Sequence, residues 1–292
     1  MSHRRYLQLD VFADRPGAGN PLAVVLDGEG LDDATMHAIA RWTRLPETTF
    51  VTKATQAGAD YRLRIFSPRR EVPFAGHPSV GTAHAVLDAG IARPHDGLLV
   101  QEGAAGLLPL RVAGEGRERT IAVRTPPARV MEVAASDDPR LEAALPGLPR
   151  GAKPPVLMHG GRRWWLLDVA SERALRAARP DWDAIGSLAQ ATGSMGVFAF
   201  ARSDDPVYYL AVRAFVGAPA AFEDAASGAA NATLAAWLAT RDALPGEGRF
   251  YRVSQGREVG HDAIIELTVD DGGQVWSGGR ACTVVRGHLD WD

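Results

Sequence analysis

The chain has 292 residues, 46% of them hydrophobic, which is enough for two domains with a buried core each. Its formal net charge of -3 gives no sign of a nucleic-acid partner, and no apolar run reaches the length of a membrane span. The first residues lead into a strand instead of an apolar signal segment, and the single cysteine, Cys282, rules out a disulfide within the chain. We therefore expect an enzyme-sized protein of the reducing cytoplasm.

Apolar patterning predicts a first lobe of strands with one amphipathic helix near its start. The helix runs to about Arg44 and is capped by Asp32 or Asp33. Pro46 then forces an extended bend, so Glu47 stands where the chain turns from helix into strand. Taken alone, a glutamate at such a junction is more often solvated than functional. Strands are expected at residues 6–12, 22–26, 98–100, 107–112 and 121–123.

A second helix of small and apolar residues is predicted to follow a strand that ends at Ser67-Pro68. Gly76 and Pro78 mark its start, because glycine allows the close approach of a ligand and proline suits the first helical turn. The free backbone N–H groups of that turn form a natural site for a carboxylate or phosphate. His77 would then lie beside an anion pocket, although a capping or core histidine is the alternative interpretation.

The same order of features occurs again in the second half of the chain. Arg213 precedes a loop with Glu223-Asp224, and Gly228 opens another helix of small residues. The separation in sequence between Asp32 and Asp181 is the same as that between Arg64 and Arg213. An offset held over some thirty residues indicates two copies of one α+β unit, too long a period for a solenoid. We therefore expect two similar lobes, each presenting a helix N-terminus, with the site between them if these face each other.

The predicted boundary between the lobes is the segment 125–155, which carries seven prolines and one short helical pattern at residues 139–145. We expect an N-terminal lobe over residues 1–124, a proline-rich crossover linker over 125–155 and a C-terminal lobe over 156–292. The final strands are candidates for packing back on the first lobe.

Five motifs follow one another along the chain: Asp10-Val11-Phe12 with Asn20-Pro21-Leu22-Ala23-Val24-Val25, Glu47-Thr48-Thr49-Phe50, Val72-Pro73-Phe74-Ala75-Gly76-His77-Pro78, Glu223-Asp224 with Ser227-Gly228, and Gln255-Gly256. In sequence and in order, these motifs resemble the PhzF family of phenazine-biosynthesis isomerases. The resemblance implies two pseudo-symmetric lobes of the diaminopimelate epimerase-like fold, each a mixed, barrel-like sheet around a central helix. It also implies an active site in the cleft, chemistry without a cofactor or metal, a small-molecule carboxylate substrate and, commonly, a homodimer.

In that family the best-understood activity is isomerisation of trans-2,3-dihydro-3-hydroxyanthranilate, in which a carbon-bound proton moves along a conjugated system. By resemblance, Glu47 matches the general base and acid, and His77 and Asp224 match its partners. Asn20, Gly76 and Gly228 match positions that line the substrate pocket. Ala229 stands where the family usually has a serine, so a hydroxyl is missing there while the backbone N–H remains.

The residues themselves are consistent with this chemistry. Proton abstraction beside an unsaturated system needs a carboxyl group whose pKa is raised by a dry cleft, so that one side chain takes and returns the proton. Two helix N-termini would hold a carboxylate and stabilise developing negative charge.

Two other functions stay open from the sequence. A racemase or epimerase of the sister families uses two opposed cysteines, whereas this chain has Cys282 alone. A non-catalytic protein that binds small carboxylates would keep the anion pocket, but its signature would be loss of the acid-base residue, and Glu47, His77 and Asp224 are all present.

Overall fold

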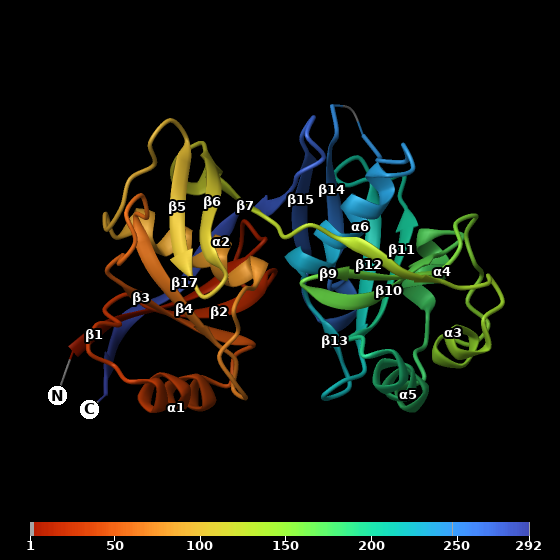
Figure 1. Ribbon diagram of the computed structural model, residues 1–292, viewed down its shortest axis with the longest axis horizontal. Helices are drawn as coiled ribbons and strands as arrows, with labels where there is room; N and C mark the ends of the chain where they lie inside the picture. The colour runs from red at the N-terminus through yellow and green to blue at the C-terminus, as the bar shows by residue number, and fades with distance from the viewer. Residues whose placement is uncertain (1–2, 247, 292) are drawn as a thin grey trace. The chain divides into compact units, whose positions relative to one another are not determined.

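The computed structural model describes residues 3–246 and 248–291, which form two compact units (Figure 1). The first unit holds the residues up to Arg124 together with those from Gly278 onward, and the second holds Thr125–Ser277. Each unit has its own mixed set of strands and its own buried helix.

The first unit is a mixed sheet in the order β17-β1-β2-β3-β4-β5-β6-β7, in which β2 pairs parallel with β3, β4 pairs parallel with β5, and the other neighbours are antiparallel. The last long strand therefore pairs with the first one. The elements are β1 (His3–Val11), β2 (Asn20–Val25), α1 (Asp33–Thr43), β3 (Glu47–Thr52), β4 (Tyr61–Phe66), α2 (Gly76–Asp88), β5 (Leu98–Gly103), β6 (Gly106–Ala113), η1 (Gly116–Glu118), β7 (Thr120–Arg124) and β17 (Ala281–Asp290).

The second unit follows a related order, β8-β9-β10-β11-β12, after which β12 pairs with both β13 and β14, and β14 with β15. Its elements are β8 (Arg129–Val133), α3 (Pro139–Ala144), β9 (Val156–Gly160), β10 (Arg162–Asp168), α4 (Glu172–Ala177), α5 (Trp182–Thr192), β11 (Gly196–Arg202), β12 (Leu210–Val216), β13 (Phe222–Asp224), α6 (Gly228–Ala239), β14 (Phe250–Gln255), η2 (Arg257–Val259) and β15 (Ala263–Val269). Strand β16 (Val275–Gly279) spans the boundary between the two units.

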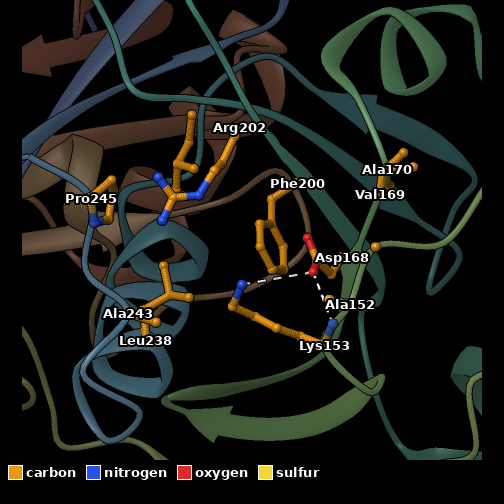
Figure 2. Close-up of a pocket in the computed structure, with 12 residues that line it drawn as sticks. Ala152, Lys153, Asp168, Val169, Ala170, Phe200, Arg202, Leu238, Ala243 and Pro245 are labelled. Carbon is orange, nitrogen blue, oxygen red and sulfur yellow. Dashed lines mark hydrogen bonds and ion pairs between the residues drawn. The ribbon is translucent and has the colours of Figure 1, made fainter.

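A hollow of about 240 Å³ lies in the second unit (Figure 2). Phe200 and Leu238 give it an apolar wall, and the Lys153 ammonium lies 3.8 Å from the Asp168 carboxylate that also accepts its backbone N–H. Its twelve lining residues include none of the seven that the sequence singles out, so we do not assign the function to it.

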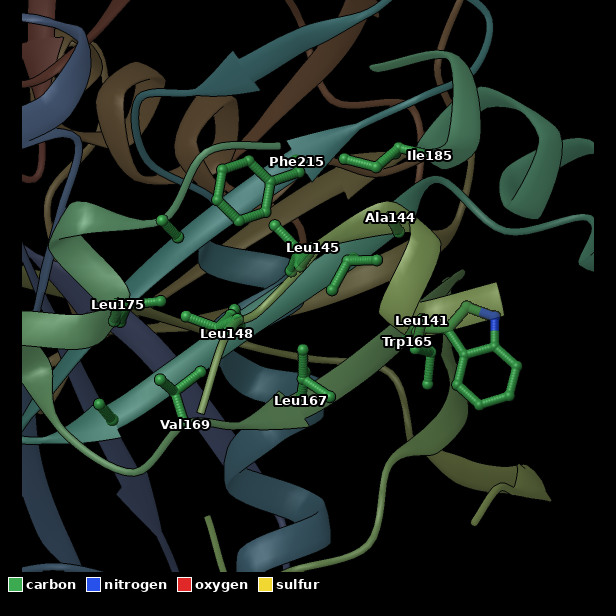
Figure 3. Packing of buried hydrophobic residues seen from close by; sticks show 14 of the residues in the cluster. Leu141, Ala144, Leu145, Leu148, Trp165, Leu167, Val169, Leu175, Ile185 and Phe215 are labelled. Carbon is green, nitrogen blue, oxygen red and sulfur yellow. The ribbon is translucent and has the colours of Figure 1, made fainter. Parts of the chain in front are cut away.

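The proline-rich segment 125–155 contributes to the core of the second unit (Figure 3). Asp138 caps α3 and Pro139 occupies its first turn, where the missing N–H of proline costs no hydrogen bond. Leu141 and Leu145 are then buried in one cluster with Trp165. The expected crossover linker thus differs from the observed structure, in which β8 and α3 belong to the second unit, because the apolar residues between its prolines pack inward.

Each unit is built around a helix that is buried almost all round, α2 in the first and α6 in the second. Helix α2 packs against β1, β2 and β3, and small residues permit the close contact. A Cβ atom at Gly81 would lie 2.6 Å from the side chains of Val11 and Leu22. The small residues of α2 therefore fix the position of its first turn, Gly76 and His77.

The two units repeat the same local interactions, which confirms the predicted pseudo-symmetric fold. Asp32 caps α1 and Asp181 caps α5, each by accepting a backbone N–H three residues later. In each unit an arginine lies over the phenylalanine two residues further on and donates two hydrogen bonds to a glutamate before the buried helix. These pairs are Arg64–Glu71, at 2.8 and 2.8 Å, and Arg213–Glu223, at 2.9 and 2.7 Å.

The second of these ion pairs is more deeply buried than the first. The Arg213 and Glu223 side chains are each 5% exposed, whereas those of Arg64 and Glu71 are 19% and 37% exposed. The difference comes from α4, because Arg213 also donates to the carbonyl oxygens of Leu175 and Ala178 at its C-terminal end.

We predict unequal costs for removing the two arginines. Arg213→Met leaves the Glu223 carboxylate buried without its partner and should lower the free energy of unfolding by about 3–5 kcal/mol. Arg64→Met removes a more solvated pair and should cost about 1 kcal/mol or less. Urea unfolding followed by circular dichroism measures both, and equal losses would contradict the burial argument. Adding Glu223→Met to Arg213→Met should recover part of the loss.

Candidate active site

Glu47, which is partly buried, and His77, which is buried, form a carboxyl–imidazole pair in the first unit. Glu47 is the first residue of β3, directly after the bend at Pro46, and His77 is the second residue of α2. The Oε2 atom of Glu47 lies 3.4 Å from Nε2 of His77, with side chains only 17% and 8% exposed. The structure therefore places side by side two of the residues that the sequence singles out.

The His77 ring is held in its neutral form. Burial lowers its pKa to about 3, and a hydrogen bond with the backbone of Pro21 only partly opposes this. Because proline has no N–H, the ring must donate to the Pro21 carbonyl oxygen, which leaves the other ring nitrogen unprotonated. The Nε2 lone pair then faces Glu47 and can accept a hydrogen bond from its protonated carboxyl group.

Asn20 and Gly76 complete the group of predicted residues in the first unit. Asn20 begins β2 and is 3% exposed, directly before the Pro21 that His77 contacts. Gly76 begins α2, where the N-cap residue Ala75 has no side-chain oxygen to accept the first-turn N–H groups. Since α2 packs on β2 and β3, these residues belong to one region. That region combines the first backbone N–H groups of α2 with the carboxyl group of Glu47.

Asp224, Gly228 and Ala229 lie together in the second unit. Asp224 ends β13, and Gly228 and Ala229 open α6, which Ser227 caps by accepting the Ala230 N–H. Burial raises the pKa of Asp224 to about 7, against the opposing effects of a hydrogen bond from the Ala226 N–H and the positive charge of Arg162. A carboxyl group with this pKa can both give and take a proton near neutral pH.

Three contributions to these groups are not visible from sequence patterns. The Pro21 carbonyl that fixes the His77 tautomer lies in a recognised motif, but nothing in the motif indicates that contact. Arg162 affects Asp224 from β10, a strand that carries no sequence signal of function. Gln255 lies in the Gln255-Gly256 motif, and its hydrogen bonds to the loop after Asp224 emerge only from the fold.

Over residues 3–246 and 248–291, no group of three or more His, Cys, Asp or Glu side chains is arranged to hold a metal ion. Within the same residues no helix is both long enough and apolar enough to span a membrane.

Comparison with known proteins gives matches over nearly the whole chain. Residues 9–287 match the model of the family described as phenazine biosynthesis-like protein. Antisense-enhancing sequence 1 of Schizosaccharomyces pombe is 31% identical over 98% of this chain and 99% of its own. Trans-2,3-dihydro-3-hydroxyanthranilate isomerase of Pseudomonas aeruginosa is 33% identical over 92% of each chain.

Solved structures agree with these matches. A phenazine biosynthesis protein of the PhzF family from Bacillus anthracis superposes with a TM-score of 0.85 and 25% identity, covering all of both chains. A probable proline racemase from Agrobacterium radiobacter has a TM-score of 0.65 and 16% identity over 99% of this chain and 93% of that one. The latter likeness shows the fold alone, and it is the fold class that the sequence predicted.

The depressed pKa of His77 predicts a specific pH dependence of stability. Between about pH 6.5 and 3 the unfolded chain binds a proton at this histidine and the folded chain does not. The free energy of unfolding should therefore fall with falling pH, by up to about 1.4 kcal/mol per pH unit from this residue. Chemical unfolding of wild type and His77→Gln across this range measures it, since the variant should lose that part of the slope. Parallel curves for the two proteins would contradict a neutral, buried His77.

Proposed function

This chain belongs to the PhzF family of phenazine biosynthesis-like proteins, and from this premise we propose that it is an isomerase that shifts a carbon-bound proton in a small carboxylate. One observation carries the proposal, the contact between partly buried Glu47 and neutral, buried His77 at the start of α2. The reaction needs no cofactor, because one carboxyl group can take a proton from one carbon and return it to another.

In the proposed reaction Glu47 is the general base and then the general acid. The substrate C–H bond breaks, its proton goes to the Glu47 carboxylate, and its electron pair enters the conjugated system. Glu47 then returns the proton at a different carbon, which gives an enol that relaxes to a ketone. While Glu47 carries the proton, the Nε2 lone pair of His77 accepts a hydrogen bond from it and holds the carboxyl group in place.

The remaining predicted residues bind the substrate and handle charge. The first-turn N–H groups of α2, which have no side-chain cap, are oriented to bind a carboxylate, and Asn20 lies on the neighbouring strand. We assign Asp224, with its pKa near neutrality, as a second group that donates or accepts a proton. Gly228 and Ala229 contribute the backbone N–H groups at the start of α6.

The test uses trans-2,3-dihydro-3-hydroxyanthranilate, the compound named for the relative from Pseudomonas aeruginosa. Wild type, incubated with it in D2O and followed by NMR, should convert it and incorporate deuterium at carbon. Glu47→Gln keeps the shape of the side chain but cannot take a proton, so turnover should fall by about 10²–10⁴-fold. Glu71→Gln is the matched control in the same unit, because Glu71 pairs with Arg64, and it should keep the wild-type rate.

Turnover by Glu47→Gln at the wild-type rate would refute the assigned base. If wild type leaves this compound unchanged, the substrate is sought among other small unsaturated carboxylates. These are screened by the rise in melting temperature that binding produces. A carboxylate that binds to wild type without any deuterium exchange would support a non-catalytic binding protein instead.

We further propose that this enzyme acts as a homodimer in the cytoplasm, as the family resemblance implies. Sedimentation velocity over a range of protein concentrations should show one species with twice the mass of a single chain. A species of single-chain mass at every concentration would contradict this proposal.

A further inference from the structure

The loop from Asp224 to Ser227 joins the three-residue strand β13 to the start of α6. A strand this short has few ladder hydrogen bonds, so other groups must hold the loop. On the N-terminal side this is done by Glu223, whose carboxylate accepts two hydrogen bonds from Arg213. Asp224 therefore directly follows a buried ion pair.

On the other side the loop is held by one buried side chain, Gln255, the last residue of β14. Gln255 is 0% exposed. Its Nε2 donates to the Asp224 carbonyl oxygen at 2.8 Å, and its Oε1 accepts from the Ser227 N–H at 3.1 Å and from Asn231 Nδ2 at 3.0 Å. A single amide thus connects the backbone of Asp224, the N-cap of α6 and the first turns of that helix.

The residue after Gln255 shows how closely the chain approaches this loop. Gly256 has φ +94°, a conformation that favours glycine, and a Cβ atom there would collide with the Ala225 carbonyl oxygen. Because Gly256 has no side chain, the end of β14 can turn directly against the loop. Gln255 is then within hydrogen-bond distance of three different groups.

The first unit has a comparable buried glutamine without this function. Gln101 on β5 is 1% exposed and donates to the Ser79 hydroxyl, which in turn donates to the carbonyl of the N-cap residue Ala75. Its Oε1 accepts from the Tyr61 hydroxyl. Among the described residues, neither atom of the Gln101 amide bonds to the backbone between Glu71 and Ala75. Gln255 differs because its amide bonds to the loop itself.

We propose that Gln255 is a positioning residue that holds Asp224 and the start of α6 in the arrangement required for proton transfer. The expected effect of Gln255 on catalysis rests on the proposed function. The expected effect of Gln255 on the titration of Asp224 does not. Without the amide, the Asp224 carbonyl and the Ser227 N–H would both lose a partner in a partly buried place, so the loop would move toward solvent. The Asp224 carboxyl would then be better hydrated and would titrate closer to its ordinary range.

The experiment compares Gln255→Met with Gln101→Met, the same change at a buried glutamine of the other unit. The titration of Asp224 is followed by ¹³C NMR on the free protein with labelled aspartate, and its signal is identified by its loss in Asp224→Asn. We expect the midpoint to fall by at least about one pH unit in Gln255→Met and to stay unchanged in Gln101→Met. Gln255→Asn keeps an amide that is one methylene too short, and it gives the same readout if Gln255→Met does not fold.

Kinetics on a substrate that wild type converts provide the second readout. We expect kcat to fall by about tenfold or more in Gln255→Met with KM changed by less than about threefold, because positioning acts on the chemical step. Gln101→Met should keep kcat. An unchanged Asp224 midpoint, or a shifted midpoint with unchanged kcat, would overturn the inference. A shifted midpoint in a protein that converts no carboxylate would support the effect of Gln255 on Asp224 and count against the proposed function alone.

Discussion

The burial of a helix start is the physical constraint on which the rest of the structure depends. Helices α2 and α6 both begin inside their units, where first-turn N–H groups have little water to bond. In the second unit, protein groups bond to the N–H groups at the helix start: Ser227 accepts the Ala230 N–H, and Gln255 accepts the Ser227 N–H. At the start of α2 the N-cap is an alanine, so no side chain of that residue serves the purpose. The start of α6 thus has a side-chain cap, and the start of α2 has none.

Desolvation then acts in opposite directions on the two titratable groups at these helix starts. It lowers the pKa of His77, which keeps the ring neutral, and raises the pKa of Asp224, which keeps a proton available near neutral pH. A basic and an acidic side chain are both driven toward their uncharged forms by the same cause.

The sequence predicts the fold class, the two units and the exact starts of α2 and α6, because glycine placement, Asp caps and the offset between repeats are local signals. The contact between Glu47 and His77 could be expected only from the family resemblance, since the residues lie on separate elements. The packing of segment 125–155 does not follow from the sequence pattern, because its prolines interrupt the apolar periodicity of the few leucines that face inward. The hydrogen bonds of Gln255 do not follow from it either, since they depend on strand pairing and on residues that lie far away in sequence.

The pairing of β17 with β1 means that the first unit is not continuous in sequence. The residues from Gly278 onward complete a sheet that begins at the opposite end of the chain. During synthesis the N-terminal part of a protein usually folds first, as soon as it leaves the ribosome. In this protein the second unit can complete its folding before the first, because it is continuous in sequence, whereas β1 pairs with β17, which is made later. The sheet that carries Glu47 is therefore completed only after the residues of β17 have been made.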